Sequence, residues 1–529
     1  MDKKDDKNTE LGITLEKHRK YKKMYKPNCL YWGLGIENEV YLEAAESISI
    51  NKNDILTKHK QERYSLDYYK NYKPEFLQRA LQKYVGAIDC STILLPRLLN
   101  SHSFTKTDIY NNSVTLYTSS QEKNPDFIGE TMLETLQRRN PYFVDNEKWL
   151  FDGDTIEFVS TNFFNTNLHE AIRELMSTKA EFIYELNKTL LHSSPVSMIT
   201  IMKENYAVAK YMTNSQNVAI FNNGTLHYNI TLPTQLNSRG EIADWNKFVN
   251  EHQRAIRAIQ WMEPFLIALY GAPDPFSSFE PGFSKSSQRC SVSRYISIGT
   301  YNSDVMERGK ILTKPLDKIM PDSKLSSSWW YNKLHSGTSS AYVKLDELGM
   351  DVNFNKHFNH GIELRFFDYI VDSSLFYESF EFIIYLMDFV LDSEMSNSLE
   401  NPIFSSVWND VVYRLIMNGK DALLSSMEVK IYSSIFSMNI TKTCVSEIYY
   451  EIFQILKTRY SRTGSFSKYV LSRNGEMDME TILSPIHKIM VPPVMPPVMP
   501  PVMPPVMPPV MPHRDRDSDK NEKKCCIIM

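Results

Sequence analysis

Hydrophobic and polar residues alternate in four segments of the chain, which is the pattern of β-strands that bury one face. The segments are residues 33–43, 152–161, 224–233 and 360–369. Their apolar faces carry Leu34, Ile36, Val40, Leu42, Ile156, Phe158, Leu226, Tyr228, Ile230, Leu232, Ile362, Leu364 and Phe366, with Asn38 among them. Their polar faces carry Glu37, Glu39, Glu157, His227, Asn229, Glu363 and Arg365, and strict alternation also places Phe367 there. If the four segments are neighbours in one antiparallel sheet, their polar faces form a single carboxylate-rich surface.

Apolar residues at helical spacing predict four long helices elsewhere in the chain. Asn167 fits the N-cap of the first helix, and a glycine closes the second. The most apolar run, residues 380–391, is shorter than the ~18 residues typical of a membrane span and contains Asp388. It therefore predicts a buried helix, and no segment is expected to cross a membrane. The predicted helices cover residues 167–191, 244–271, 373–395 and 445–462.

Strands mixed irregularly with helices predict an α+β fold, with an antiparallel sheet flanked by helices and a mostly helical C-terminal part. The chain ends in a proline-rich, charged segment that predicts a disordered tail. Residues 50–145 are polar and carry no clear motif, so we interpret them as an insertion or covering segment with its own helices. The expected organisation is a basic arm at 1–28, a folded body at 29–485 that includes this insertion, a linker at 486–513 and a charged tail at 514–529.

The composition indicates a globular protein and argues against nucleic-acid binding and secretion. The 529 residues are 42% hydrophobic and 23% charged, which is an ordinary globular balance, and the net charge of -4 gives no reason to expect nucleic acid as a partner. The first ten residues lack the apolar stretch of a secretory signal. Residues 17–26 are basic and predict a solvated arm, with a membrane-surface contact as the alternative. Cysteines 29, 90, 290 and 444 show neither metal nor disulfide spacing, which indicates a reducing compartment.

The C-terminal tail carries a repeat and a lipidation motif. The tetrapeptide PPVM occurs five times from Pro492, which predicts an extended polyproline spacer, with an aromatic-groove domain as an alternative binding partner. The chain ends Cys-Ile-Ile-Met, so Cys526 fits a farnesylation site. One prenyl chain anchors weakly, so Cys525 is the candidate for palmitoylation. We therefore expect a lipid anchor on the cytoplasmic face of a membrane, and a cytosolic protein if the tail is unprocessed.

The polar faces suggest metal chemistry. Four carboxylates close together cannot all ionise cheaply without cations, and hard oxygen ligands with a single histidine favour Mg²⁺ or Mn²⁺. Arg365 on the same surface could contact a transferring phosphoryl group. Each feature alone has a plainer interpretation, because alternate acids are usually solvated and a lone histidine is usually structural. Their shared layout favours metal ions beneath a nucleotide.

Several motifs resemble the glutamate–cysteine ligase family, within the glutamine synthetase superfamily of carboxylate–amine ligases. The resemblance lies in GIENE, TIEFVST, LHYNITLP, SRYISIGTYN and GIELRFFDY, in family order between about residues 30 and 370, and in WMEPFLIALYGAPDPF at 261–276. Thr231 stands where the family usually has serine. The resemblance implies a funnel-shaped antiparallel sheet that binds ATP and two or three Mg²⁺ ions.

By this resemblance, Glu37, Glu39, Glu157, His227 and Glu363 are expected metal ligands. Arg365 is expected to contact phosphate, Arg294 the phosphoryl group or the substrate carboxylate, and Asn229 the nucleotide. The implied reaction joins glutamate, or a related carboxylate, to an amine through an acyl phosphate. The alternatives are a kinase, a protein-modifying enzyme and a non-catalytic, membrane-anchored binding module. Asp152 and Asp154 are spare ligands or turn residues.

Overall fold

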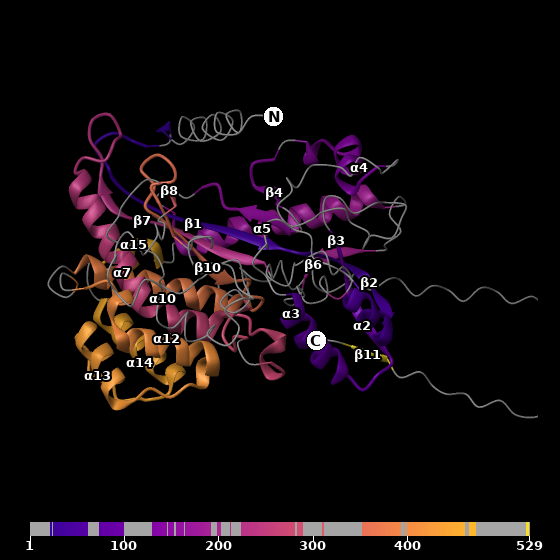
Figure 1. Ribbon diagram of the computed structural model, residues 1–529. Helices are drawn as coiled ribbons and strands as arrows, with labels where there is room; N and C mark the ends of the chain where they lie inside the picture. Colours follow the sequence, from indigo (N-terminus) through magenta and orange to yellow (C-terminus); the bar gives the residue numbers. More distant parts are fainter. Residues whose placement is uncertain are drawn as a thin grey trace, which may run out of the picture.

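The computed structural model describes most of the predicted body. The described residues are 22–23, 25–61, 74–99, 130–144, 146–152, 155–162, 164, 166–191, 198–202, 212, 224–280, 283–288, 309–310, 352–392, 396, 399–460, 465–471 and 525–527. Strands and helices alternate irregularly among them, and the fold is α+β (Figure 1). The sequence prediction of that class is confirmed. Arg294, Asp154 and the PPVM repeat lie outside the described residues.

Among the described residues, the main sheet has seven antiparallel strands, and the four predicted segments lie side by side within it. The strand order is β4-β5-β1-β7-β10-β9-β8. The strands are β1 (Leu30–Val40), β4 (Trp149–Asp152), β5 (Thr155–Val159), β7 (Thr225–Gln235), β8 (Gly309–Lys310), β9 (Val352–Phe354) and β10 (Ile362–Asp368). The hypothesis that the polar faces share one surface is therefore confirmed for β5, β1, β7 and β10. Asp152 ends β4 opposite Thr155.

A second sheet, which has four strands in the described part of the chain in the order β11-β3-β2-β6, was not predicted. It consists of β2 (Leu42–Asn51), β3 (Thr92–Leu99), β6 (Ile199–Ile201) and β11 (Cys525–Ile527). Strand β3 lies in the predicted insertion, for which helices were expected. Strand β11 pairs in parallel with β3, so the expectation of a disordered tail is wrong for these three residues. The strand reads Cys-Cys-Ile, and its β-branched Ile527 suits an added edge strand.

The four predicted helices are present, and three of them bury the apolar face of the main sheet. Asn167 caps α5 by accepting a hydrogen bond from the Glu170 N–H, and Asp388 is buried inside α10. The helices are α2 (Lys52–Gln61), α3 (Pro74–Gly86), α4 (Met132–Arg139), α5 (Leu168–Leu190), α7 (Trp245–Tyr270), α10 (Ser373–Leu391), α12 (Ser406–Asn418), α13 (Ser426–Ile435), α14 (Val445–Tyr460) and α15 (Phe466–Leu471). No helix of the described residues is long and apolar enough to cross a membrane.

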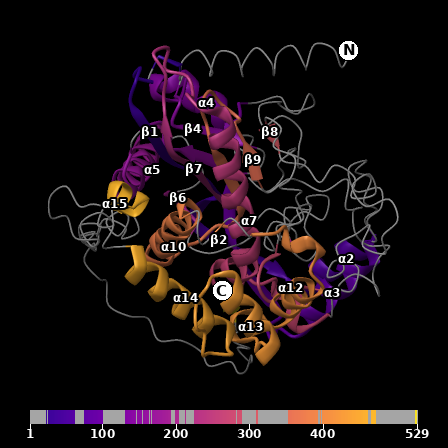
Figure 2. The ribbon, with the colours of Figure 1, turned by 90° about the vertical axis from the view of Figure 1, so that its left-hand side faces the viewer.

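Helices α5, α7 and α10 contact the sheet directly, and α12–α14 pack below α7 and α10 (Figures 1 and 2). Polar contacts tie these layers together as well as apolar ones. Tyr228 on β7 is 2.7 Å from the Ser379 hydroxyl of α10, and the Trp408 indole of α12 donates to the Gln260 carbonyl of α7. The helices therefore cover the apolar face of the main sheet. The polar side chains of the strands lie on the opposite face.

Three other expectations are corrected. A bulge between Leu364 and Phe367 places Phe367 opposite Leu226, and its ring centroid lies 4.9 Å from that of Tyr228 in the core. Strict alternation had put Phe367 on the polar face, because the extra residue of a bulge is invisible in a period-two pattern. Tyr25, in the basic arm, is buried against Tyr31, so the arm is not wholly solvated. Cys90 is disulfide-bonded, which the lack of disulfide spacing did not predict.

Candidate metal centre

The strand register sets the predicted polar residues in rows across the sheet. Glu37 lies opposite His227, and Glu39 lies opposite Glu157. Glu363 lies opposite Asn229 on one side and Asn353 on the other. Residues directly opposite in an antiparallel pair have Cβ atoms about 4.5–5.5 Å apart, so each row brings its side chains into contact range. The carboxylates therefore form one continuous surface.

Glu37, His227 and Glu363 converge most closely, with a potential ligand atom of each within 4.8 Å of the other two. His227 Nδ1 lies 3.1 Å from Glu37 Oε2 and 3.6 Å from Glu363 Oε1. His227 Nε2 lies 3.1 Å from the Thr225 hydroxyl oxygen, and the Asn229 amide donates to Glu37 Oε1 across 3.4 Å. Two carboxylates and an imidazole thus face the same partly enclosed position, where one metal ion could bind all three.

Lys356, which the sequence reasoning missed, is a cation at this point. Its Nζ lies 3.2 Å from Glu363 Oε2, and Arg365 Nη1 lies 3.6 Å from Glu363 Oε1. The Asn353 amide also donates to the Glu363 carboxylate, whose side chain is 0% exposed. A fully buried carboxylate would be costly alone, and these donors and cations compensate for the burial of Glu363.

The electrostatic balance of the cluster favours ionised acids. Burial disfavours the charged form of Glu37, but Lys356, the hydrogen bond from His227 and Arg365 outweigh it and hold the Glu37 pKa well below its usual range. Burial likewise opposes the charged form of Lys356, but Glu37 and Glu363 outweigh it and raise the Lys356 pKa. Acids and cation therefore stabilise each other.

The loop that presents Lys356 is held by specific contacts. Asn355, at its start, has a φ of 45°, in the left-handed region that asparagine tolerates better than most residues. The Gly361 N–H donates to the Thr231 hydroxyl across 2.9 Å, so threonine supplies here the hydroxyl that serine would. A Cβ at Gly361 would lie 2.3 Å from the Ile230 carbonyl oxygen, so only glycine fits there. This loop fixes Lys356 over the acids.

The donor set fits a hard divalent cation. Among the described residues, the carboxyl groups of Glu37, Glu39, Glu157 and Glu363 share this surface with the cations Lys356 and Arg365. Carboxylate oxygens with one imidazole are ligands that both Mg²⁺ and Mn²⁺ accept. Lys356 is attracted to Glu157 as well as to Glu37 and Glu363, which shows that these groups share one electrostatic field. The side chains of Cys525 and Cys526, like Arg294, lie outside the described residues.

Together, these features define an α+β protein whose antiparallel sheet presents a carboxylate-rich surface opposite a helical core. An uncharacterized protein of Acanthamoeba polyphaga mimivirus is 39% identical to the chain over 415 residues, which cover 78% of this chain and 71% of the viral protein. The chain belongs to the same family as that viral protein. No protein-family model matches it. The relative's name states no activity, so the function is inferred from the site.

Proposed function

We propose that this protein is an ATP- and Mg²⁺-dependent ligase that joins glutamate, or a related carboxylate, to an amine through an acyl phosphate. The observation that supports the proposal most strongly is the convergence of Glu37, His227 and Glu363 on one face of an antiparallel sheet. The neighbouring Glu39–Glu157 row adds carboxylates for a second ion. A glutamine synthetase-like funnel is the architecture in which such a face serves this chemistry.

The proposal assigns each residue a role that suits its position. Glu37, His227 and Glu363 would hold one metal ion, and Glu39 and Glu157 another. Bound Mg²⁺ would neutralise and polarise the phosphate oxygens of ATP. The rest of the surface would position the reacting groups, which is most of what phosphoryl transfer requires of a protein.

The cations of the site are expected to contact the transferred group. Arg365 is 19% exposed and lies beside Glu363, so its guanidinium can reach both the metal cluster and a phosphate above it. Lys356 would supply a second positive charge there. Arg294 is proposed to bind the phosphoryl group or the substrate carboxylate, and Asn229 to contact the nucleotide.

We further propose that the C-terminal tail places this activity on the cytoplasmic face of a membrane. The Cys-Ile-Ile-Met end would carry a farnesyl group on Cys526, with Cys525 as a palmitoylation site. The five PPVM repeats would act as a spacer between the anchor and the folded body. Pairing of β11 with β3 and lipidation of the same residues would be alternative states of this end.

The test is ADP release by the full-length protein with Mg²⁺, ATP and glutamate, with and without a pool of amines that includes cysteine. Release that requires an amine supports the ligase, and the amine that restores it identifies the acceptor. Glu363→Gln should abolish the release, whereas Glu130→Gln, at a carboxylate paired with Arg138 outside the site, should not. Release that persists in Glu363→Gln would contradict the proposal, and a stable phosphorylated product would indicate a kinase instead.

A further inference from the structure

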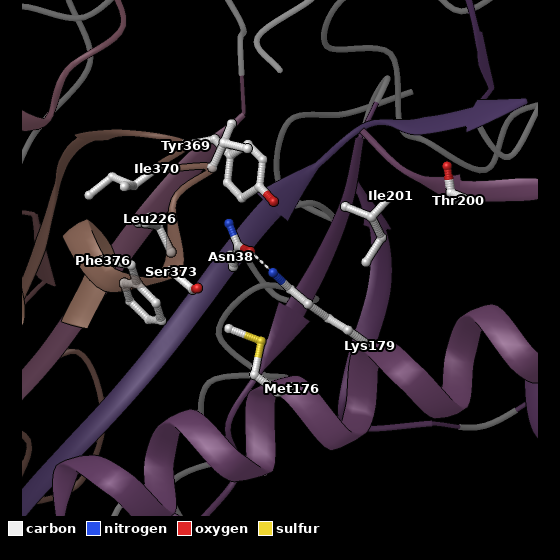
Figure 3. Close-up of a pocket in the computed structure, with 11 residues that line it drawn as sticks. Asn38, Met176, Lys179, Thr200, Ile201, Leu226, Tyr369, Ile370, Ser373 and Phe376 are labelled. Carbon is white, nitrogen blue, oxygen red and sulfur yellow. Dashed lines mark hydrogen bonds between the residues drawn. The ribbon is translucent and has the colours of Figure 1, made fainter. Parts of the chain in front are cut away.

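A cavity of about 50 Å³ lies beside β1 (Figure 3). Because Asn38 lines it, the cavity lies on the face of β1 opposite Glu37 and Glu39. Strand β1 contributes Asn38 to it, and helix α5 contributes Lys179. Most of its wall is apolar. The apolar side chains that line it include Met176, Ile201, Leu226, Ile370 and Phe376.

Lys179 is a buried lysine in this wall, with 7% of its surface exposed. Its ammonium has three donors, and the Asn38 amide oxygen is its hydrogen-bond acceptor among the described residues (Figure 3). The Asn38 Nδ2 in turn donates to the Thr225 carbonyl oxygen across 2.8 Å, which fixes the amide with its oxygen toward the lysine. The rings of Tyr369 and Phe158 lie 5.5 and 5.9 Å from Nζ.

No carboxylate of the described residues forms an ion pair with Lys179, which sets it apart from Lys356 on the other face of the sheet. Buried charges in proteins are normally paired, because an isolated ion away from water is strongly destabilised. Desolvation accordingly lowers the Lys179 pKa to about 7.

We propose that this cavity binds a short-chain aliphatic carboxylate, whose carboxylate pairs with Lys179 and whose alkyl group contacts the apolar wall. The volume fits a molecule of this size, because one water needs about 10–15 Å³ of such space. Ser373 and Phe376, in the first turn of α10, complete the wall of the cavity on that side. The apolar wall disfavours a fully hydrated ion such as free phosphate.

This inference is independent of the proposed ligase function, since the cavity and the acidic face lie on opposite sides of β1. The test is isothermal titration of the full-length protein with butyrate, beside 1-butanol and butylamine as matched neutral and cationic probes. Butyrate should bind, and the other two should bind at least tenfold more weakly. Glu363→Gln, on the acidic face, should leave butyrate affinity unchanged, which separates this cavity from a substrate-carboxylate site.

Two variants test the role of the charge. Lys179→Met removes the positive charge and keeps a side chain of similar volume. Asn38→Asp places a carboxylate beside Lys179 as a permanent counter-ion. Each variant should lower butyrate affinity at least tenfold. Asn38→Asp should also raise the melting temperature, which shows that the loss of binding does not come from misfolding. Equal butyrate affinity in the wild type and both variants would overturn the proposal. No binding of butyrate by the wild type, or equal binding of butanol, would overturn it as well.

Discussion

Two lysines show how differently the same side chain can be used in one fold. Lys356 lies among carboxylates, and their attraction raises its pKa. Lys179 lies among apolar groups, and burial lowers its pKa to about 7. Neither was predicted from the sequence, because Lys356 sits in a loop without periodicity and Lys179 occupies one helical position among many. Glu37, His227 and Glu363, by contrast, were predictable, since alternation on a strand fixes which face a residue shares.

Replacing Lys356 tests whether the acidic side chains of the site bind a metal ion, because the lysine ammonium competes with such an ion for Glu363. Lys356→Met should raise the affinity of the full-length protein for Mn²⁺ about tenfold, because it removes a positive charge beside Glu363. It should also lower the melting temperature in EDTA by several degrees, since Glu363 loses a partner, and added Mn²⁺ should restore it. Lys188→Met, whose lysine pairs with Glu185 on the exposed surface of α5, is the control. Unchanged Mn²⁺ affinity in Lys356→Met would contradict this account.

The depressed pKa of Lys179 predicts a pH dependence of stability. Between about pH 7 and the usual lysine pKa near 10.5, the unfolded chain holds a proton on this residue that the folded chain has lost. The free energy of unfolding of the wild type should therefore rise with pH above 7, relative to Lys179→Met, by up to about 1.4 kcal/mol per pH unit. Burial raises the pKa of the adjacent Tyr369, so it stays neutral through this range. Chemical denaturation at pH 6.5, 7.5 and 8.5 measures the difference, and parallel curves would contradict the assignment.

At the scale of elements, the sequence predicted regular segments and missed irregular ones. The strands around Glu37, Glu157, His227 and Glu363 and the four long helices were predictable, because periodicity persists over their whole length. The bulge that turns Phe367 into the core was not, since one inserted residue breaks the period locally. The second sheet was missed because β3 and β11 are apolar runs without alternation, which periodicity does not distinguish from buried helix.

Gly224 directly precedes β7, and replacing it tests how closely β7 packs against β1 near the site. It has a φ of 80°, and a Cβ there would lie 2.7 Å from the Glu39 carbonyl oxygen. Gly224→Ala should therefore lower the free energy of unfolding by about 1–3 kcal/mol. Gly86→Ala is the matched control, because its Cβ would meet nothing within 4 Å and its stability should stay equal or rise slightly. Equal unfolding free energies of the two variants would show that β7 tolerates a shift at its start.

At the scale of the whole molecule, the lipidation motif predicts where the protein is found. Cys526→Ser removes the farnesylation site and should move most of the protein expressed in eukaryotic cells from the membrane to the soluble fraction. Cys525→Ser, which keeps the farnesyl group, should cause a smaller shift, because one chain still anchors weakly. Fractionation followed by immunoblotting measures both. Identical membrane fractions for the wild type and Cys526→Ser would contradict the proposed anchor.

The central claim is that the acidic face binds a metal ion together with ATP, and metal binding tests it more directly than turnover does. The measurement is free Mn²⁺ by electron paramagnetic resonance, as the full-length protein is titrated with Mn²⁺ with and without a non-hydrolysable ATP analogue. The account predicts at least one Mn²⁺ site that tightens with the analogue and is lost in Glu37→Gln and Glu363→Gln. Mn²⁺ binding that is unchanged in both variants, or no binding by the wild type, would contradict it.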